Sequence, residues 1–170
     1  MEILFRQRRA VDVAAALACF AMFAYAIYSQ QFQGLTPCPL CIFQRVGITA
    51  LGIAFLLAAV PGERPLALRR SAAVLLVLVA LATAGVAVRH IYIQHLPDDR
   101  VPICGATLEY MMSAFSPGEV LRKVLTGSGE CHKVDWTFLG LAMPTWVLLW
   151  MLGLGSVGFA VNWRRPRRER

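Results

Sequence analysis

Charged residues are scarce in this 170-residue sequence: they make up 16% of the chain, whereas about a quarter is usual for a soluble domain. No haem, flavin or nicotinamide motif is present, and there is no internal repeat. Hydrophobic residues make up 58%, and the mean hydropathy is +0.58. This shortage of charge argues against a soluble globular domain, and the missing cofactor motifs restrict any redox chemistry to side chains and to a loosely bound acceptor.

The hydrophobic residues gather in four long runs that polar stretches separate. We predict membrane spans at about 10–28, 42–60, 71–88 and 144–161, and therefore an all-α membrane four-helix bundle in one domain, 1–170. A span of this length extends about 28 Å, close to the roughly 30 Å hydrocarbon core. The first run has the preceding basic residues of a signal peptide. It is too long and lacks a small-residue cleavage site, so we expect a retained span.

The basic residues lie beside these runs. Eleven of the 17 Lys and Arg residues fall in the N-terminal segment, the 63–70 loop and the C-terminal tail. Four spans put these three segments on one side, which the positive-inside rule makes cytoplasmic. The loops at about 29–41 and 91–143 then face the periplasm of a bacterial inner membrane, where disulfides persist. The net charge of +7 is explained by basic residues that flank membrane spans and contact membrane lipid. We therefore expect no nucleic-acid partner.

Four of the five cysteines lie in the two outward loops, as two pairs. Cys38 and Cys41 form a C-x-x-C motif just before the second hydrophobic run, and Cys104 and Cys131 lie in the longer loop. The dipole and the unpaired N–H groups at the start of a helix favour a thiolate, which here is Cys41. Two dithiol pairs on an oxidising face predict a relay that passes electrons by disulfide exchange.

Such a relay needs a terminal electron acceptor. A lipid-soluble quinone requires no covalent motif and can approach Cys41 from the bilayer. Arg45 follows Cys41 by four residues and so shares its helix face, where the guanidinium can stabilise negative charge on quinone oxygens. The alternative for Arg45 is a side chain that reaches the lipid headgroups.

The residues alone leave other uses of the thiols open. One alternative is a tetrahedral zinc site, with ligands drawn from Cys38, Cys41, Cys104, Cys131 and His132. A second is a pair of structural disulfides, although a helix-terminal thiol beside a fixed cation is a reactive arrangement. The fifth cysteine, Cys19, lies within the first run, and we expect it to be inert packing.

The second outer loop carries its own helix signal. Ser116-Pro117-Gly118-Glu119 is a capping-box pattern with proline at the first helical position, and Gly127 is a stop. The helix between them would present Val120, Leu121, Val124 and Leu125 on one face, with Arg122 and Lys123 opposite. It would then either pack on the loop or lie on the membrane surface.

Two stretches resemble the bacterial disulfide-bond formation protein B (DsbB) family. One is the C-x-x-C motif followed at four residues by Arg45. The other runs from Gly129-Glu130-Cys131 through the W-x-F-L-G-L-x-M-P-x-W sequence of residues 136–146. The resemblance implies an inner-membrane enzyme, a protein-disulfide:quinone oxidoreductase. It would reoxidise a DsbA-like periplasmic oxidase of the thioredoxin fold and deliver electrons to the quinone pool, as ubiquinone or menaquinone.

The resemblance also implies roles for single cysteines. Cys104 would form the intermolecular disulfide with the partner, and Cys131 would be its mate. Cys131 would exchange with Cys38, and Cys41 would contact the quinone ring. It implies no metal ligands.

Three further positions match the family's quinone site: Arg45, His90 and Met143. The family pattern has Tyr-Glu-Arg after the second cysteine, whereas this chain has Phe43-Gln44-Arg45. The missing carboxylate leaves Arg45 less neutralised, which is expected to alter quinone affinity or redox poise.

Overall fold

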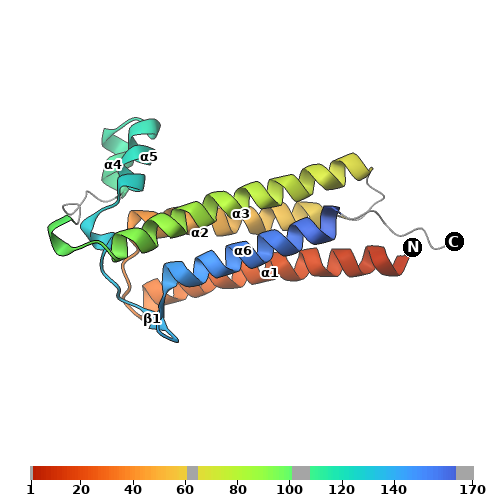
Figure 1. Cartoon of the computed structure of the whole chain (residues 1–170), viewed down its shortest axis with the longest axis horizontal. Helices are drawn as coiled ribbons and strands as arrows, with labels where there is room; N and C mark the ends of the chain where they lie inside the picture. Colours follow the sequence, from red (N-terminus) through yellow and green to blue (C-terminus); the bar gives the residue numbers. More distant parts are fainter. Residues whose placement is uncertain (1, 61–64, 101–107, 164–170) are drawn as a thin grey trace.

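The computed structural model describes residues 2–60, 65–100 and 108–163. Four long helices form a bundle (Figure 1). They are α1 (Glu2–Phe32), α2 (Pro39–Ala59), α3 (Leu66–Gln94) and α6 (Met143–Trp163). Each contains a segment long and apolar enough to cross a membrane. The predicted all-α membrane four-helix bundle is therefore confirmed.

All four helices extend beyond the predicted spans at one or both ends, and α1 and α3 do so most. The C-terminal end of α3 matters for the site. This helix begins at Leu66 and ends at Gln94, and its 29 residues correspond to about 44 Å, more than the hydrocarbon core needs. The predicted third span ends at residue 88, just before the polar pair Arg89-His90. The helix instead continues for another turn, and His90 is 3% exposed within the protein. His95 caps the helix, so the boundary lies one turn later than expected.

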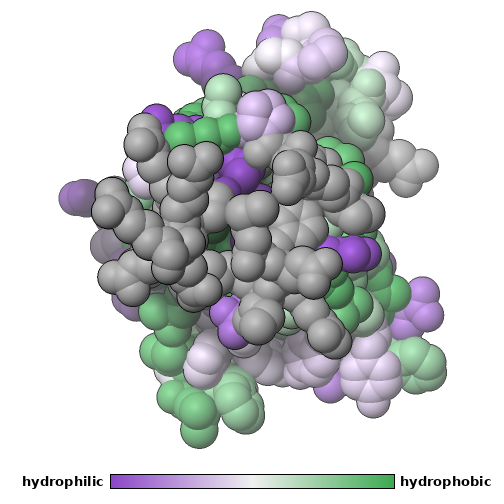
Figure 2. All heavy atoms as spheres, turned by 90° about the vertical axis from the view of Figure 1, so that its right-hand side faces the viewer, coloured by the Kyte–Doolittle hydropathy of each residue, from purple (hydrophilic) through white to green (hydrophobic). Residues whose placement is uncertain are grey.

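The bundle core consists mostly of small and medium side chains from all four helices, with Phe55 as its largest member. Cys19 is fully buried there, as expected of a packing residue. Gly47 lets α2 approach α3, because a Cβ at this position would overlap the Thr83 side chain. Large hydrophobic residues face outward along the helices, and Figure 2, which views the end where α1 begins, shows hydrophobic side chains reaching the flanks. Such a surface suits contact with lipid.

A buried polar cluster joins α1 to α6 at this end. The Asn162 side chain donates to Asp12 Oδ1 over 3.0 Å and to the Gly158 carbonyl over 3.1 Å. Arg8 Nη1 in turn donates to Asn162 Oδ1 over 3.4 Å. Asp12 and Asn162 are fully buried, so these hydrogen bonds hold polar groups that would be costly to bury alone.

The opposite end carries the short elements. Among the described residues these are η1 (Asp98–Arg100), α4 (Leu108–Ala114), α5 (Pro117–Thr126), η2 (Gly129–Cys131), β1 (Thr137–Phe138) and β2 (Leu141–Ala142). The predicted helix start and stop are both confirmed for α5: Glu119 accepts from the Ser116 N–H over 3.1 Å, and Gly127 ends the helix with φ +88°. Val120 and Val124 are buried in a second apolar cluster, so this part of α5 packs on the protein. The predicted apolar face is only half right, because Leu121 and Leu125 are exposed.

The W-x-F-L-G-L sequence forms a β-hairpin that the sequence did not predict. β1 pairs with β2 in antiparallel register, and Leu139 and Gly140 form the turn with φ of +51° and +77°. Positive φ at both turn residues matches the twist of a tight hairpin. Trp146 Nε1 donates to the Phe138 carbonyl over 3.1 Å and so fastens the hairpin to the first turn of α6.

Candidate functional site

The C-x-x-C motif forms the N-terminus of α2. The helix begins at Pro39, and Cys38 is its N-cap, whose sulfur accepts from the Cys41 N–H over 3.4 Å. Cys38 Sγ also donates to Cys41 Sγ over 3.2 Å. Both are free thiols. The local sequence thus holds two sulfurs in contact at a helix end, where the unpaired N–H groups favour negative charge on sulfur.

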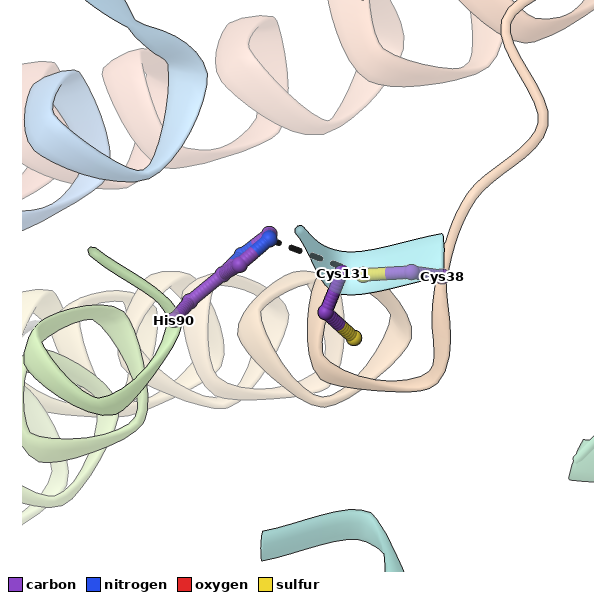
Figure 3. Close-up of side chains that lie close together, drawn as sticks. All are labelled: Cys38, His90 and Cys131. Carbon is purple, nitrogen blue, oxygen red and sulfur yellow. Dashed lines mark hydrogen bonds between the residues drawn. The ribbon is translucent and has the colours of Figure 1, made fainter. Parts of the chain in front are cut away.

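Cys131 joins this pair from the long loop. It is fully buried at the end of η2, with its sulfur, Cys38 Sγ and a His90 ring nitrogen all within 4.8 Å of one another (Figure 3). The Cys38 thiol hydrogen-bonds to the sulfurs of both Cys131 and Cys41. Hydrogen bonding by Cys38, then by the Ser128 N–H and hydroxyl and the Leu40 N–H, outweighs burial and lowers the pKa of Cys131 to about 6. The same contacts raise the pKa of Cys38, which keeps its proton.

His90 reaches the sulfurs from α3. Its Nε2 lies 3.7 Å from Cys38 Sγ, and its Nδ1 lies 3.2 Å from the Gln44 side-chain nitrogen. In Figure 3 the imidazole points toward the Cys38 sulfur. His90 lines a small cavity of about 70 Å³ together with Cys38, Cys41, Arg45 and Met143, so five of the predicted site residues meet there. Gln44 contacts the imidazole on the side away from Cys38.

A larger, apolar cavity adjoins the small one, and Cys41, Arg45, Trp136 and Met143 line both. Its volume is about 710 Å³, within the range of ligand sites, and α1, α2, α6 and the hairpin all contribute to its wall. Aromatic side chains dominate this wall: Tyr25, Trp136, Phe138, Trp146 and Trp150. Cys41, Arg45 and Met143 line it as well, so three of the predicted site residues meet at one cavity.

Arg45 is fixed by α1. Its Nη1 donates to Gln30 Oε1 over 2.6 Å, and its Nη2 donates to the Ala26 carbonyl over 3.0 Å. These bonds hold the guanidinium at the wall of the apolar cavity. Nothing in the sequence pattern pointed to Gln30, because its position depends on how α1 packs against α2.

The fourth predicted relay cysteine, Cys104, lies outside the described residues. The zinc alternative named His132, and this residue points elsewhere, since its Nδ1 lies 3.0 Å from the Ile93 carbonyl oxygen. Ser128 and Gln44, which contact the two functional side chains Cys131 and His90, were not predicted as site residues.

Comparison with known proteins gives a consistent set of relatives. The family model described as "Disulfide bond formation protein DsbB" matches residues 8–161. A Disulfide bond formation protein B from Xanthomonas axonopodis pv. citri is 47% identical over 138 residues, covering 81% of this chain and 80% of the relative. The one from Methylococcus capsulatus is 46% identical over 151 residues (89% and 92%). The one from Xylella fastidiosa is 40% identical over 153 residues (90% and 88%).

Proposed function

Because this chain belongs to the DsbB family of disulfide bond formation proteins, we propose that it reoxidises a DsbA-like periplasmic dithiol oxidase by disulfide exchange and passes the electrons to a membrane quinone. Membership of this family makes it a membrane thiol oxidoreductase. The observation that carries the finer proposal is the position of Cys41, which contacts the Cys38 sulfur and also lines the apolar cavity.

In the proposed relay, the partner's two thiols reduce a Cys104–Cys131 disulfide, and the partner leaves oxidised. The Cys131 thiolate then attacks Cys38 of a Cys38–Cys41 disulfide, so that a Cys38–Cys131 bond forms and Cys41 leaves as a thiolate. Attack by Cys104 on Cys131 restores the loop disulfide and frees Cys38. The Cys38–Cys41 dithiol finally closes to a disulfide, and its two electrons and two protons pass to the quinone, which leaves as the quinol.

The exchange step is supported by the state of the two sulfurs. The thiolate is the form of cysteine that attacks disulfides. When Cys38 is bonded to Cys41 it has no S–H to donate, but hydrogen bonds from the Ser128 N–H and hydroxyl and from the Leu40 N–H still lower the pKa of Cys131. Cys38 Sγ lies within 4.8 Å of Cys131 Sγ. The helix N-terminus beside both sulfurs favours the negative charge that moves from Cys131 to Cys41 as the exchange proceeds.

The quinone step is supported by the chemistry of the apolar cavity. Its aromatic wall suits a flat, apolar ring, and its volume admits a small-molecule head group. Arg45, held by α1 beside Cys41, is positioned to stabilise charge that develops on a quinone oxygen. Met143, in the first turn of α6, contributes an adaptable apolar contact. We assign His90 a role beside the sulfurs: its Nε2 lies 3.7 Å from Cys38 Sγ, so the imidazole can exchange a proton with Cys38.

We further propose a bacterial inner-membrane location, one membrane domain and cytoplasmic termini. Arg8, Arg69 and Arg70 lie near helix starts at the opposite end of the bundle from Cys38 (Figure 1). The three chain segments next to the helix termini at that end hold 11 of the 17 Lys and Arg residues of the sequence. This majority matches the positive-inside rule, with the cysteines in the periplasm.

Quinone reduction by a reduced DsbA-type protein tests the proposal, with ubiquinone and menaquinone assayed side by side through loss of quinone absorbance. Cys41→Ser should abolish quinone reduction while Cys104 still traps the partner in a mixed disulfide. Arg45→Ala should raise the KM for quinone. Cys19→Ser is the matched control, because Cys19 is buried in the core away from the site. Wild-type quinone reduction by Cys41→Ser would remove Cys41 from its proposed role.

A further inference from the structure

Three of the site's side chains are arranged as metal ligands. Cys38 Sγ, Cys131 Sγ and a His90 ring nitrogen lie within 4.8 Å of one another, and all three residues are buried. Tetrahedral zinc separates two thiolates by about 3.8 Å, and a thiolate from an imidazole nitrogen by about 3.6 Å. The observed 3.7 Å between Cys38 Sγ and His90 Nε2 is within about 0.1 Å of the second separation. Small side-chain movements would complete the set.

We infer that the reduced protein binds one thiophilic metal ion of the Zn²⁺ class through Cys38, Cys131 and His90, and that this ion halts the thiol relay. The three ligands come from three separate segments: the N-cap of α2, the η2 loop and α3 (Figure 3). One ion would therefore crosslink the outer end of the bundle. Metal binding does not depend on the proposed function. The inhibition does rest on the proposed function.

The surroundings provide what such an ion needs beyond three ligands. The fourth zinc position takes a water when only three protein groups bind. The cavity of about 70 Å³ beside Cys38 and His90 has room for it, since one water needs about 15 Å³. A metal-bound Nε2 requires the proton on Nδ1. There Gln44 can accept it through its carboxamide oxygen after a half-turn of the amide.

Metal binding and disulfide exchange use the same electron pairs. The ion binds the two cysteines as thiolates and releases their protons, without oxidation or reduction. A sulfur engaged in a disulfide offers no such ligand, so only the reduced cluster binds. The ion therefore competes with formation of the Cys38–Cys131 bond, and it arrests the protein when the quinone supply fails and thiols accumulate.

Cobalt spectroscopy tests the site on the intact, detergent-solubilised protein under anaerobic conditions. The reduced protein should take up about one Co²⁺ per chain, with sulfur-to-cobalt charge-transfer absorbance that Zn²⁺ displaces. Oxidising the same protein should abolish the bands, a comparison that needs no substitution. Cys131→Ser should lose them and Cys19→Ser should keep them.

The experiments distinguish failure of the metal site, failure of the inhibition and failure of the proposed function. Absence of charge-transfer bands in the reduced wild type, or their full retention in Cys131→Ser, would overturn the metal site even if the metal-free protein reduces quinone normally. Zn²⁺ bound at this site without loss of quinone reduction would overturn the inhibition. A metal-free protein that never reduces quinone would refute the proposed function and leave the cobalt result standing.

Discussion

Replacing Cys38 by alanine should raise the pKa of Cys131, because hydrogen bonding by Cys38 is the largest cause of its low value. At a pKa of about 6, roughly 90% of Cys131 is thiolate at pH 7. At the ordinary value of 9.0 the fraction is about 1%. In Cys38→Ala, burial still opposes ionisation of Cys131, and hydrogen bonds from Ser128 and Leu40 still favour it. We therefore expect the midpoint of the Cys131 titration to rise by about 1 to 3 pH units.

Cys131 is fully buried, so a reagent that must reach the sulfur would report access rather than charge. The ¹³Cβ resonance of labelled cysteine follows ionisation directly and resolves Cys131 from the other thiols. Cys38→Ser is the matched variant: its hydroxyl still donates, and serine remains a good N-cap for α2. Its midpoint should lie between those of wild type and Cys38→Ala. An unchanged midpoint near pH 6 in Cys38→Ala would refute the assignment of Cys38 as the donor.

Three other outcomes follow from contacts elsewhere in the bundle. Asn162→Ala removes the donor to the buried Asp12 carboxylate and should lower the free energy of unfolding by about 1–3 kcal/mol, measured in a denaturant titration, with unchanged activity per folded molecule. Gly47→Ala should cost about 1–3 kcal/mol through overlap with Thr83, and Thr83→Ala should restore much of it; additive losses would contradict the contact. Because folding lowers the pKa of Cys131, its contribution is fully present above pH 9 and lost toward pH 6, so the melting temperature of the reduced protein should fall on acidification across that range, and it should fall less in Cys131→Ala.

The four helices could be predicted because hydrophobic length alone identifies spans. Their ends could not, since a polar residue ends a hydrophobic run without ending a helix. His90 shows this: its polarity suggested a boundary, yet the last turn of α3 continues past it and buries it against the sulfurs. The start and end of α5 were predictable, because a capping box and a positive-φ glycine act within a few residues.

The site residues divide in the same way. Cys38, Cys41 and Arg45 were identified by spacing, which a helix converts directly into geometry. Gln30 and Gln44 were not identified as partners of Arg45 and His90, because those contacts depend on the packing of α1 and α3 against α2. The hairpin turn at 139–140 was missed as well, since leucine is an unusual residue for a left-handed turn position.

Cys41 borders two cavities, one of about 70 Å³ beside Cys38 and His90, the other of about 710 Å³ with five aromatic side chains in its wall. In the proposed relay, Cys41 receives electrons through the Cys38 sulfur and gives them up at the larger cavity. The water-soluble client and the lipid-dissolved oxidant would then never need to touch, so neither would constrain the shape of the other. Such a design is modular: either reactant could be exchanged for a different one while the site of the other stays unchanged.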